Sequence, residues 1–408
     1  MPVKEKKQYT EDALVRIAKR ENNTRRNYLI VDPLQAKHVP VSPGKALELF
    51  GALAQTFKEE YHAEKLLLIG FAETATAIGA QAAICVDSYY MQTTREILPG
   101  TEYLFFSEEH SHATEQKLAR KDLDEWLPVV DRIIFIEDEV TTGNTIWNGI
   151  RVIRKTYPEQ KLRFSVASIL NGMSAEQLAR YQENGIPVHY LVKTDHSIFP
   201  EVAEKFRGDG KYINCCLETI TDTIDFAELT IDGMKNSRRL VAASDYMRAC
   251  EELWTGFQKK VLHPAGKKAQ EEICHRKTSF SKKLRILVLG TEEFMYPAIF
   301  IGMKLENYGF EVFCHATTRS PIAVSCEEEY PLHTRYELKS LYDGTRTTYL
   351  YDIDGYDAVY IFTDAALSEA GKISLWNALS VKNHRITLIR CMTEESTCQY
   401  VDHTRVLC

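Results

Sequence analysis

Apolar residues in the first half of the chain follow two alternating patterns. Short continuous apolar runs are typical of strands buried on both faces of a sheet, and they cover residues 28–31, 65–71, 102–106, 132–138, 162–170 and 188–192. Apolar residues recur at helical spacing after Ser42-Pro43, a good helix start, and in residues 144–156 and 175–184. Strands that alternate with helices predict a parallel sheet in an α/β domain.

The same alternation restarts at Leu284. Apolar runs predict strands at residues 284–290, 310–316, 357–362 and 385–391, and helices are expected at 297–308 and 367–382. Residues 323–356 are poorly patterned, whereas residues 200–258 indicate two helical pieces and no strong strand. The second half therefore predicts another, smaller α/β domain.

The junction between the two halves is polar and basic. Residues 259–283 contain eight lysines and arginines but only two glutamates, which is typical of a solvated linker, with a contact for a polyanion as the alternative. We predict a first domain at residues 1–235, a helical and basic linker at 236–283 and a second domain at 284–408. No internal repeat is visible in the sequence.

Composition narrows the classes of protein to be considered. The 408 residues suit two domains of ordinary size. The formal net charge of −7 gives no global positive field that would gather nucleic acid. The ten cysteines show no Cys-x2-Cys spacing of a zinc site, which favours free thiols in a reducing compartment. Because the chain has neither a signal-peptide core nor a long apolar run, we expect a soluble cytoplasmic protein without membrane contact.

The segment Arg132–Thr145 carries the clearest chemistry. A buried strand is expected to deliver Glu137 and Asp138 at its carboxyl end, where ligands bind in open α/β sheets. The following loop offers backbone N–H groups, hydroxyls and a helix N-terminus, which suit a phosphate dianion; it consists of Thr141, Thr142, Gly143, Asn144 and Thr145. Carboxylates beside a phosphate cradle predict a site for a phosphorylated sugar. The second glycine and the lysine of a P-loop are missing, and so is a dinucleotide fingerprint.

This segment resembles the phosphoribosyl-pyrophosphate (PRPP) loop of type I phosphoribosyltransferases. In that family two acidic residues end a strand, two variable positions follow, and a Thr/Ser-Thr/Ser-Gly-x-Thr/Ser loop comes next. Glu139 departs from the pattern, because an aliphatic residue is usual there. The resemblance implies that PRPP binds with Mg²⁺, which Glu137 and Asp138 contact indirectly, and that a base-like acceptor displaces pyrophosphate. We also expect a homodimer.

The same resemblance implies two further loops in the first domain. A pyrophosphate loop is expected at Ala72, Glu73, Thr74 and Ala75, with Arg95 as a phosphate partner, although Glu73 stands where a basic residue is common. A flexible lid is expected at residues 107–117, where His110 and His112 could donate to pyrophosphate or move a proton.

Polar residues also follow the expected strands of the second domain. Thr291, Glu292 and Glu293 follow one strand, and Thr318, Arg319 and Ser320 follow another, so these loops are expected to line one crevice. GTEEFMYP and TTRSP resemble the TRSP domain, which is found C-terminal to orotate-phosphoribosyltransferase-like domains. Such proteins are associated with bacterial tellurite-resistance and stress-response gene clusters. The resemblance does not imply a role for the TRSP domain.

Three functions are compatible with these features. The first is a phosphoribosyltransferase that moves ribose 5-phosphate from PRPP to a nucleobase or base-like acceptor. The second is a regulator that binds PRPP or a nucleotide without turnover, which Glu73 favours. The third is a nucleotide phosphorolase or hydrolase in a stress-metabolite pathway. The intact loop at residues 137–145 indicates that ligand binding is retained.

Overall fold

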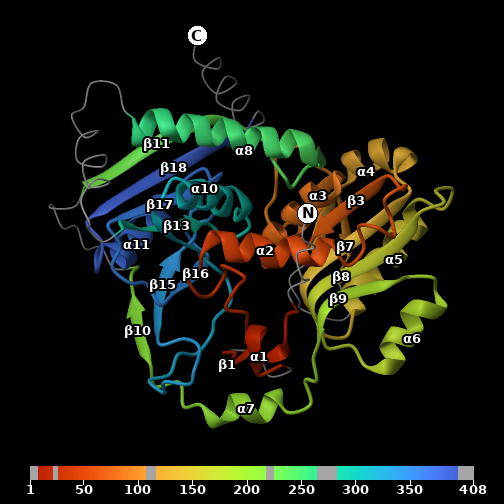
Figure 1. Cartoon of the computed structure of the whole chain (residues 1–408), viewed down its shortest axis with the longest axis horizontal. Coiled ribbons are helices and arrows are strands. Elements are labelled where there is room, and N and C mark those ends of the chain that lie inside the picture. Colours follow the sequence, from red (N-terminus) through yellow and green to blue (C-terminus); the bar gives the residue numbers. More distant parts are fainter. Residues whose placement is uncertain (1–7, 22–25, 107–115, 217–224, 264–282, 394–408) are drawn as a thin grey trace, which may run out of the picture. The chain divides into compact units, whose positions relative to one another are not determined.

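The computed structural model describes residues 8–21, 26–106, 116–216, 225–263 and 283–393 (Figure 1). Its contacts divide the chain into two compact units that are interleaved in sequence. Unit 1 consists of Met1–Arg16, Leu47–Val202 and Asn236–Asp245, and unit 2 consists of Ile17–Ala46, Ala203–Lys235 and Tyr246–Cys408. These units do not coincide with the domain boundaries expected at 235 and 284, which stay a prediction. Unit 2 also holds more residues than unit 1, whereas the sequence predicts a smaller second domain.

Unit 1 is built on a six-stranded sheet with the strand order β12-β4-β3-β7-β8-β9. The sheet is parallel except for the β12–β4 pair. Its strands are β3 (Leu66–Gly70), β4 (Tyr89–Gln92), β7 (Arg132–Val140), β8 (Arg163–Asn171), β9 (Val188–Lys193) and β12 (Val241–Ala242). The parallel α/β sheet predicted from the sequence is therefore confirmed.

Helices and one hairpin complete unit 1. The hairpin pairs β5 (Tyr103–Phe106) with β6 (Gln116–Ala119) in antiparallel register. The helices are α1 (Glu11–Leu14), α3 (Thr76–Val86), α4 (Arg120–Trp126), α5 (Asn144–Thr156) and α6 (Ala175–Glu183), and α7 (Phe199–Lys205) and α2 (Pro43–Ala54) run across the division between the units. Helix α3 approaches β3 closely, because a Cβ on Gly79 would lie 2.9 Å from the Cα of Gly70. Glycines at both positions bring the helix onto the strand.

Unit 2 contains a five-stranded parallel sheet with the order β11-β18-β17-β13-β14. Its strands are β11 (Asp225–Met234), β13 (Arg285–Gly290), β14 (Glu311–Ala316), β17 (Ala358–Thr363) and β18 (Arg385–Thr393). Strand β11 corrects the expectation that residues 200–258 hold no strong strand. It lies at the sheet edge, where Glu228, Thr230 and Asp232 are exposed and alternate with more buried neighbours. It therefore lacks the continuous apolar run by which the other strands are predicted.

A hairpin also lies within the poorly patterned residues 323–356 of unit 2. It joins β15 (Thr334–Lys339) to β16 (Thr347–Tyr351), and β10 (Lys211–Asn214) pairs with β15. Leu338 and Leu350 of the hairpin pack with Val359 of the sheet and Leu375 of α11 (Glu369–Ser380) in one core. The other elements of the unit are α10 (Tyr296–Asn307), most of α8 (Ala243–Phe257), and the strands β1 (Arg16–Lys19) and β2 (Tyr28–Val31). In the part of the chain that the structure describes, no helix is long and apolar enough to cross a membrane.

Candidate functional site

The acidic residues of the PRPP-loop motif lie at the carboxyl end of β7. This strand runs to Val140, two residues beyond its expected end at residue 138. Glu137 and Asp138 lie within it, as expected, and are partly buried. Only residues 141–143 separate it from α5, which covers the residues predicted to be helical. The motif thus has the strand, short loop and helix context that the sequence predicts.

Gly143 determines the shape of the loop that follows β7. Its φ is 74°, in the left-handed region, and a Cβ there would lie 2.9 Å from the hydroxyl of Tyr181. The Tyr181 hydroxyl donates a 2.6 Å hydrogen bond to the Gly143 carbonyl oxygen, while Thr142, Asn144 and Thr145 are exposed. Exposed hydroxyl and N–H donors at a helix N-terminus form an environment that attracts an anion.

A hydrogen bond joins this strand end to the loop after β3. The Thr74 hydroxyl donates to Oδ1 of Asp138 at 2.8 Å. The backbone N–H of Ala72 donates to the Thr93 hydroxyl at 2.8 Å, and Gln116 donates to the Ala72 carbonyl oxygen at 2.9 Å. The expected pyrophosphate loop therefore contacts an acidic residue of the PRPP-loop motif, and it is also held by Thr93, just after β4, and by Gln116 of β6.

The strand order shows why the carboxyl ends of β3 and β7 are a suitable place for a ligand. Strand β3 has β4 on one side and β7 on the other, so the chain changes direction across the sheet between β3 and β7. Ligands of open α/β sheets bind beyond the carboxyl ends of the strands at such a switch point. Gly70, Glu137 and Asp138 lie at these ends.

The electrostatic environment gives Glu137 a pKa unlike that of an ordinary surface carboxylate. Burial, and then the negative charges of Asp138 and Glu139, raise the pKa of Glu137 well above its usual value. The positive charge of Arg95 acts in the opposite direction. Arg95, expected as a phosphate partner, therefore interacts electrostatically with Glu137.

Glu73 remains the departure within the pyrophosphate loop. Its side chain is buried, with 5% of the residue exposed, and its carbonyl oxygen accepts a hydrogen bond from the Thr76 hydroxyl. The peptide bond between Ala72 and Glu73 is cis. The expected catalytic histidines, His110 and His112, lie outside the described residues, as does most of the expected lid.

The structure explains Glu139, the other departure from the family pattern. Its carboxylate lies 3.5 Å from Nδ1 of His196, and both side chains are largely buried. A Cβ on Gly172 would lie 2.4 Å from the His196 ring, and the Thr194 hydroxyl bonds to its Nε2 at 2.7 Å. His196 comes from the segment after β9, and the sequence does not predict its role, because an isolated histidine after a strand gives no motif.

The residues expected in the second crevice lie in unit 2. Glu292, Glu293 and Arg319 come together as ion pairs, with Nε of Arg319 2.6 Å from Glu292 and its Nη2 3.8 Å from Glu293. Thr291 bonds to Thr363 at the end of β17. Thr318 and Ser320 instead support the turn, since the Thr318 hydroxyl accepts from the Ser320 N–H at 3.2 Å.

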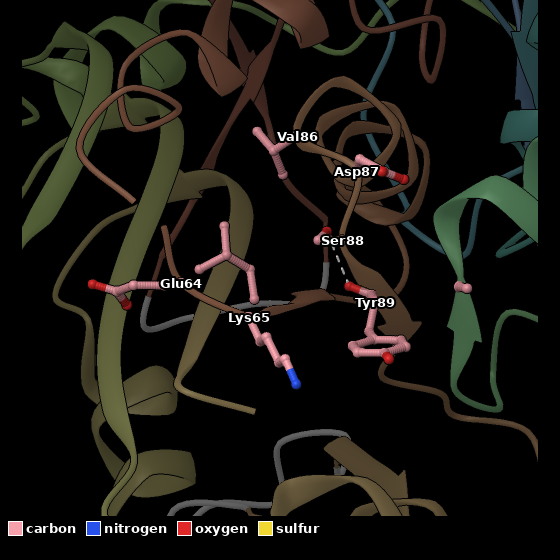
Figure 2. A pocket seen from close by; sticks show the side chains of 8 residues that line it. Glu64, Lys65, Val86, Asp87, Ser88 and Tyr89 are labelled. Atoms are coloured by element: carbon pink, nitrogen blue, oxygen red, sulfur yellow. Dashed lines mark hydrogen bonds between the residues drawn. The ribbon is translucent and has the colours of Figure 1, made fainter. Parts of the chain in front are cut away.

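A cavity of about 300 Å³ in unit 1 lies at the other edge of the sheet (Figure 2). Its lining includes Lys65, Leu66, Ser88 and Tyr89, which lie at the start of β3 and β4. The carboxyl ends of parallel strands are at the opposite edge. This cavity is therefore separate from the residues of the motif.

Comparisons with known proteins agree with the resemblance. Residues 14–195 match the model of a phosphoribosyl transferase family, and residues 255–379 match the TRSP domain that lies C-terminal to it. Residues 17–46 thus match the transferase family in sequence although they pack within unit 2. No curated protein matches the chain.

Solved structures similar to the chain include several adenine phosphoribosyltransferases. The enzyme from Rhodothermus marinus is 15% identical with a TM-score of 0.30, and the match covers 45% of this chain and 96% of that one. The enzyme from Giardia lamblia, solved with 9-deazaadenine, is 11% identical with a TM-score of 0.33 over 45% and 96% of the two chains. The enzyme from Leishmania donovani is 14% identical with a TM-score of 0.32 over 47% and 86%.

The family matches, together with the strand, loop and helix context of the motif, decide the class of the protein. The chain is a phosphoribosyltransferase, in which a phosphoribosyl transferase domain is followed by a TRSP domain.

Proposed function

We propose that the chain transfers the 5-phosphoribosyl group of PRPP to a nitrogen of a nucleobase or base-like acceptor, with release of pyrophosphate. The observation that carries this proposal is the hydrogen bond between Thr74 and Asp138. It brings the two loops that would hold opposite ends of PRPP to the switch point of one sheet. The reacting C1′ atom would then lie between the loops.

Each part of the site has a distinct task in this reaction. The exposed Thr142, Asn144 and Thr145 and the amino end of α5 would bind the 5-phosphate. Asp138 and Glu137 would accept hydrogen bonds from the ribose hydroxyls, and Arg95 would offset negative charge near them. As the acceptor nitrogen forms its bond to C1′, the bond from C1′ to the pyrophosphate oxygen breaks, and pyrophosphate leaves with the electron pair. The nitrogen then loses its proton to water.

The residues present fit an Mg²⁺ ion that is held mainly by its substrate. Hard carboxylate oxygens are suitable ligands for Mg²⁺, and Glu137 and Asp138 supply them at the site. Within the described residues no group of three or more His, Cys, Asp or Glu side chains could hold a metal alone. When bound, the ion would neutralise charge on the pyrophosphate. We expect a soluble cytoplasmic homodimer.

An assay with the full chain tests this function. PRPP labelled in its pyrophosphate is incubated with Mg²⁺ and a panel of bases, and pyrophosphate release is measured with and without each base. Release that depends on one acceptor supports the transferase. Release without any acceptor would instead indicate a hydrolase.

Two aspartates at opposite ends of β7 provide a matched pair of variants. Asp138→Asn should abolish measurable PRPP binding, because it removes the acceptor charge at the site. Asp131→Asn is the control, since Asp131 lies just before β7, at the opposite sheet edge, where it accepts a hydrogen bond from Lys65. Equal PRPP binding in Asp138→Asn and wild type would overturn the assignment.

The buried Glu73 favours a second candidate, a regulator that binds PRPP or a nucleotide without turnover. A carboxylate in the pyrophosphate loop disfavours an anion there. This candidate predicts PRPP binding that Asp138→Asn abolishes, but no pyrophosphate release with any base. Glu73→Gln would then strengthen PRPP binding.

A further inference from the structure

Unit 2 repeats the topology of unit 1, although the sequence shows no repeat. In unit 1 the central strand β3 has β4 on one side, and β7 and then β8 on the other. In unit 2, β13 has β14 on one side, and β17 and then β18 on the other. Each unit also inserts an antiparallel hairpin between its second and third strands, β5–β6 in unit 1 and β15–β16 in unit 2. The switch point of unit 2 therefore lies between β13 and β17.

Polar side chains from three strand ends meet at this switch point. Thr291 follows β13, and its hydroxyl bonds to that of Thr363 on β17 at 2.8 Å. Glu292, with φ of 48° in the left-handed region, follows Thr291 and pairs with Arg319 from the loop after β14. These are the positions that correspond in topology to the loop after β3 and the acidic end of β7.

The turn of the β15–β16 hairpin, residues 340–346, adds three more groups. Nη1 of Arg346 lies 2.9 Å from the same Oε2 of Glu292 that Arg319 contacts, and the Ser340 hydroxyl donates to Oε1 of Glu292. The Tyr342 hydroxyl donates to Oδ1 of Asp364, just after β17, at 2.5 Å. The hairpin turn thus contacts two of the strand ends.

A segment from the transferase match also reaches this cluster. The ammonium group of Lys37, which is fully buried, donates to the carbonyl oxygens of Glu292 and Thr317, both at 2.9 Å. Nearby His315 is neutral, since burial and then the charge of Lys37 lower its pKa to about 4. Its Nδ1 accepts from the Ala316 N–H, which leaves Nε2 to donate to the Tyr351 carbonyl oxygen.

The exposed side of the cluster carries the two guanidinium groups together with Asp343, whose carboxylate lies 4.0 Å from Nη2 of Arg346 and whose side chain is 45% exposed. The side chains of Glu292 and Glu293 are 2% and 0% exposed, whereas those of Arg319 and Arg346 are 13% and 24% exposed. A ligand that approaches therefore meets two guanidinium groups that share one buried carboxylate, that of Glu292. Desolvation makes buried ion pairs a costly way to gain stability, and paired arginines suit the oxygens of a phosphate group.

We propose that unit 2 holds a second binding site, for a phosphorylated sugar, at the carboxyl ends of β13, β14 and β17. Arg319 and Arg346 bind the phosphate, and Asp364 with Tyr342 binds sugar hydroxyls. Glu292 positions both arginines. The site is distinct from the one at β7 and does not depend on turnover there.

Equilibrium binding of labelled ribose 5-phosphate to the full chain tests this site. Wild type should bind two equivalents, one in each unit. Arg346→Met should weaken the binding of one equivalent at least about tenfold, because a hydrogen bond to a charged group is lost. Asp138→Asn should affect only the other equivalent, so failure of this proposal and failure of the proposed function give different results.

Arg285→Met is the matched control. Arg285 lies at the amino end of β13, has a side chain 26% exposed and pairs with Asp354 at 3.0 Å, so its burial and charge resemble those of Arg346. It should leave both equivalents unchanged. If Arg346→Met fails to fold, Arg346→Lys keeps the charge but loses the planar fork, and should still weaken binding.

One result overturns the proposal. If wild type binds a single equivalent that Asp138→Asn removes and both Arg346 variants leave intact, the cluster in unit 2 is a structural ion network only.

Discussion

The two units share a strand order but fix their strand ends by different chemistry. In unit 1 the hydroxyl of Thr74, in the loop after β3, donates to Asp138 near the end of β7, and the residues proposed to bind phosphate are exposed. In unit 2 a hydroxyl contact also joins the ends of β13 and β17, from Thr291 to Thr363. There, in addition, a buried lysine and arginines that share Glu292 connect the loop after β13 to the loop after β14 and to the hairpin turn. The topology gives both units polar residues at the same edge of a sheet, and the loop sequence decides their chemistry.

This difference predicts where each unit is sensitive to mutation. In unit 1 the loop after β7 consists of glycine and residues with polar side chains. Its exposed groups contribute little to folding, so changes in this loop should affect ligand binding more than stability. Unit 2 has charges that are buried together, so changes there should affect stability as well. The following variants compare the two, starting with the largest expected effect.

Lys37→Met should cause the largest loss of stability. It leaves the carbonyl oxygens of Glu292 and Thr317 without the buried ammonium group that contacts both. We expect a loss of about 3 kcal/mol in the free energy of unfolding, measured by calorimetry. Lys45→Met is the control, because Lys45 is exposed on α2. Equal melting temperatures for the two variants would show that Lys37 does not hold the strand ends of unit 2 together.

Gly143→Ala should cause a large loss of binding in unit 1, second only to that of Asp138→Asn. The added Cβ would press against the Tyr181 hydroxyl and would also force alanine into the left-handed region. We expect PRPP affinity to fall about 100-fold, because small displacements of a binding group have effects of that size. Gly185→Ala is matched to it, with φ of 68° and open space around its Cβ. It shares the backbone strain but should leave PRPP affinity unchanged, and similar losses in both variants would contradict a role for the loop.

The sequence predicts the parts of the molecule that are encoded locally. Continuous apolar runs identify β3, β7, β8, β13 and β17, and the motif places Glu137 and Asp138 at a strand end. Strand β11 is not predicted, because an edge strand with one exposed face lacks such a run. The short strands β4 and β6 are too brief to give a pattern of their own.

Contacts between distant segments account for the rest. Nothing in residues 17–46 indicates that they pack with residues 290–351, yet Val41 pairs with Cys314 and Lys37 reaches Glu292. The pairing of Glu139 with His196 likewise joins residues far apart in the sequence. The repeated topology is invisible for the same reason, since strand order depends on which strands pair and not on their local composition.

Thr74→Val should have a moderate effect in unit 1. It removes the hydroxyl that donates to Asp138, which we expect to reduce stability by about 1 kcal/mol and to raise the KM for PRPP about fivefold. Thr56→Val is the control, because the Thr56 hydroxyl donates to the Leu53 carbonyl oxygen away from the site. Its stability should fall by a similar amount while KM stays unchanged. A KM that rises equally in both would indicate a general loss of rigidity and no specific link between the loops.

Glu137→Gln should have the smallest effect on stability, one confined to a pH range. Burial and the neighbouring carboxylates raise the pKa of Glu137 in the folded state, so the folded protein holds this proton more tightly than the unfolded chain does. The resulting stabilisation is present at low pH and is lost as the pH rises through the raised pKa. Glutamine mimics the protonated form at every pH. The variant should therefore melt at a higher temperature than wild type under alkaline conditions, and the two curves should converge on acidification.

Activity should follow the opposite trend. Only the ionised carboxylate is a full acceptor for ribose hydroxyls, so wild-type kcat/KM should fall as the pH drops through the raised pKa, while Glu137→Gln should be slow throughout. Melting curves and pyrophosphate release measured across the same pH series test both trends. Glu183→Gln is the control for loss of a surface charge, because Glu183 is exposed on α6. If the melting-temperature difference between wild type and Glu137→Gln does not widen with pH, the ionised Glu137 does not destabilise the fold. The contrast with the buried charges of unit 2 would then be sharper.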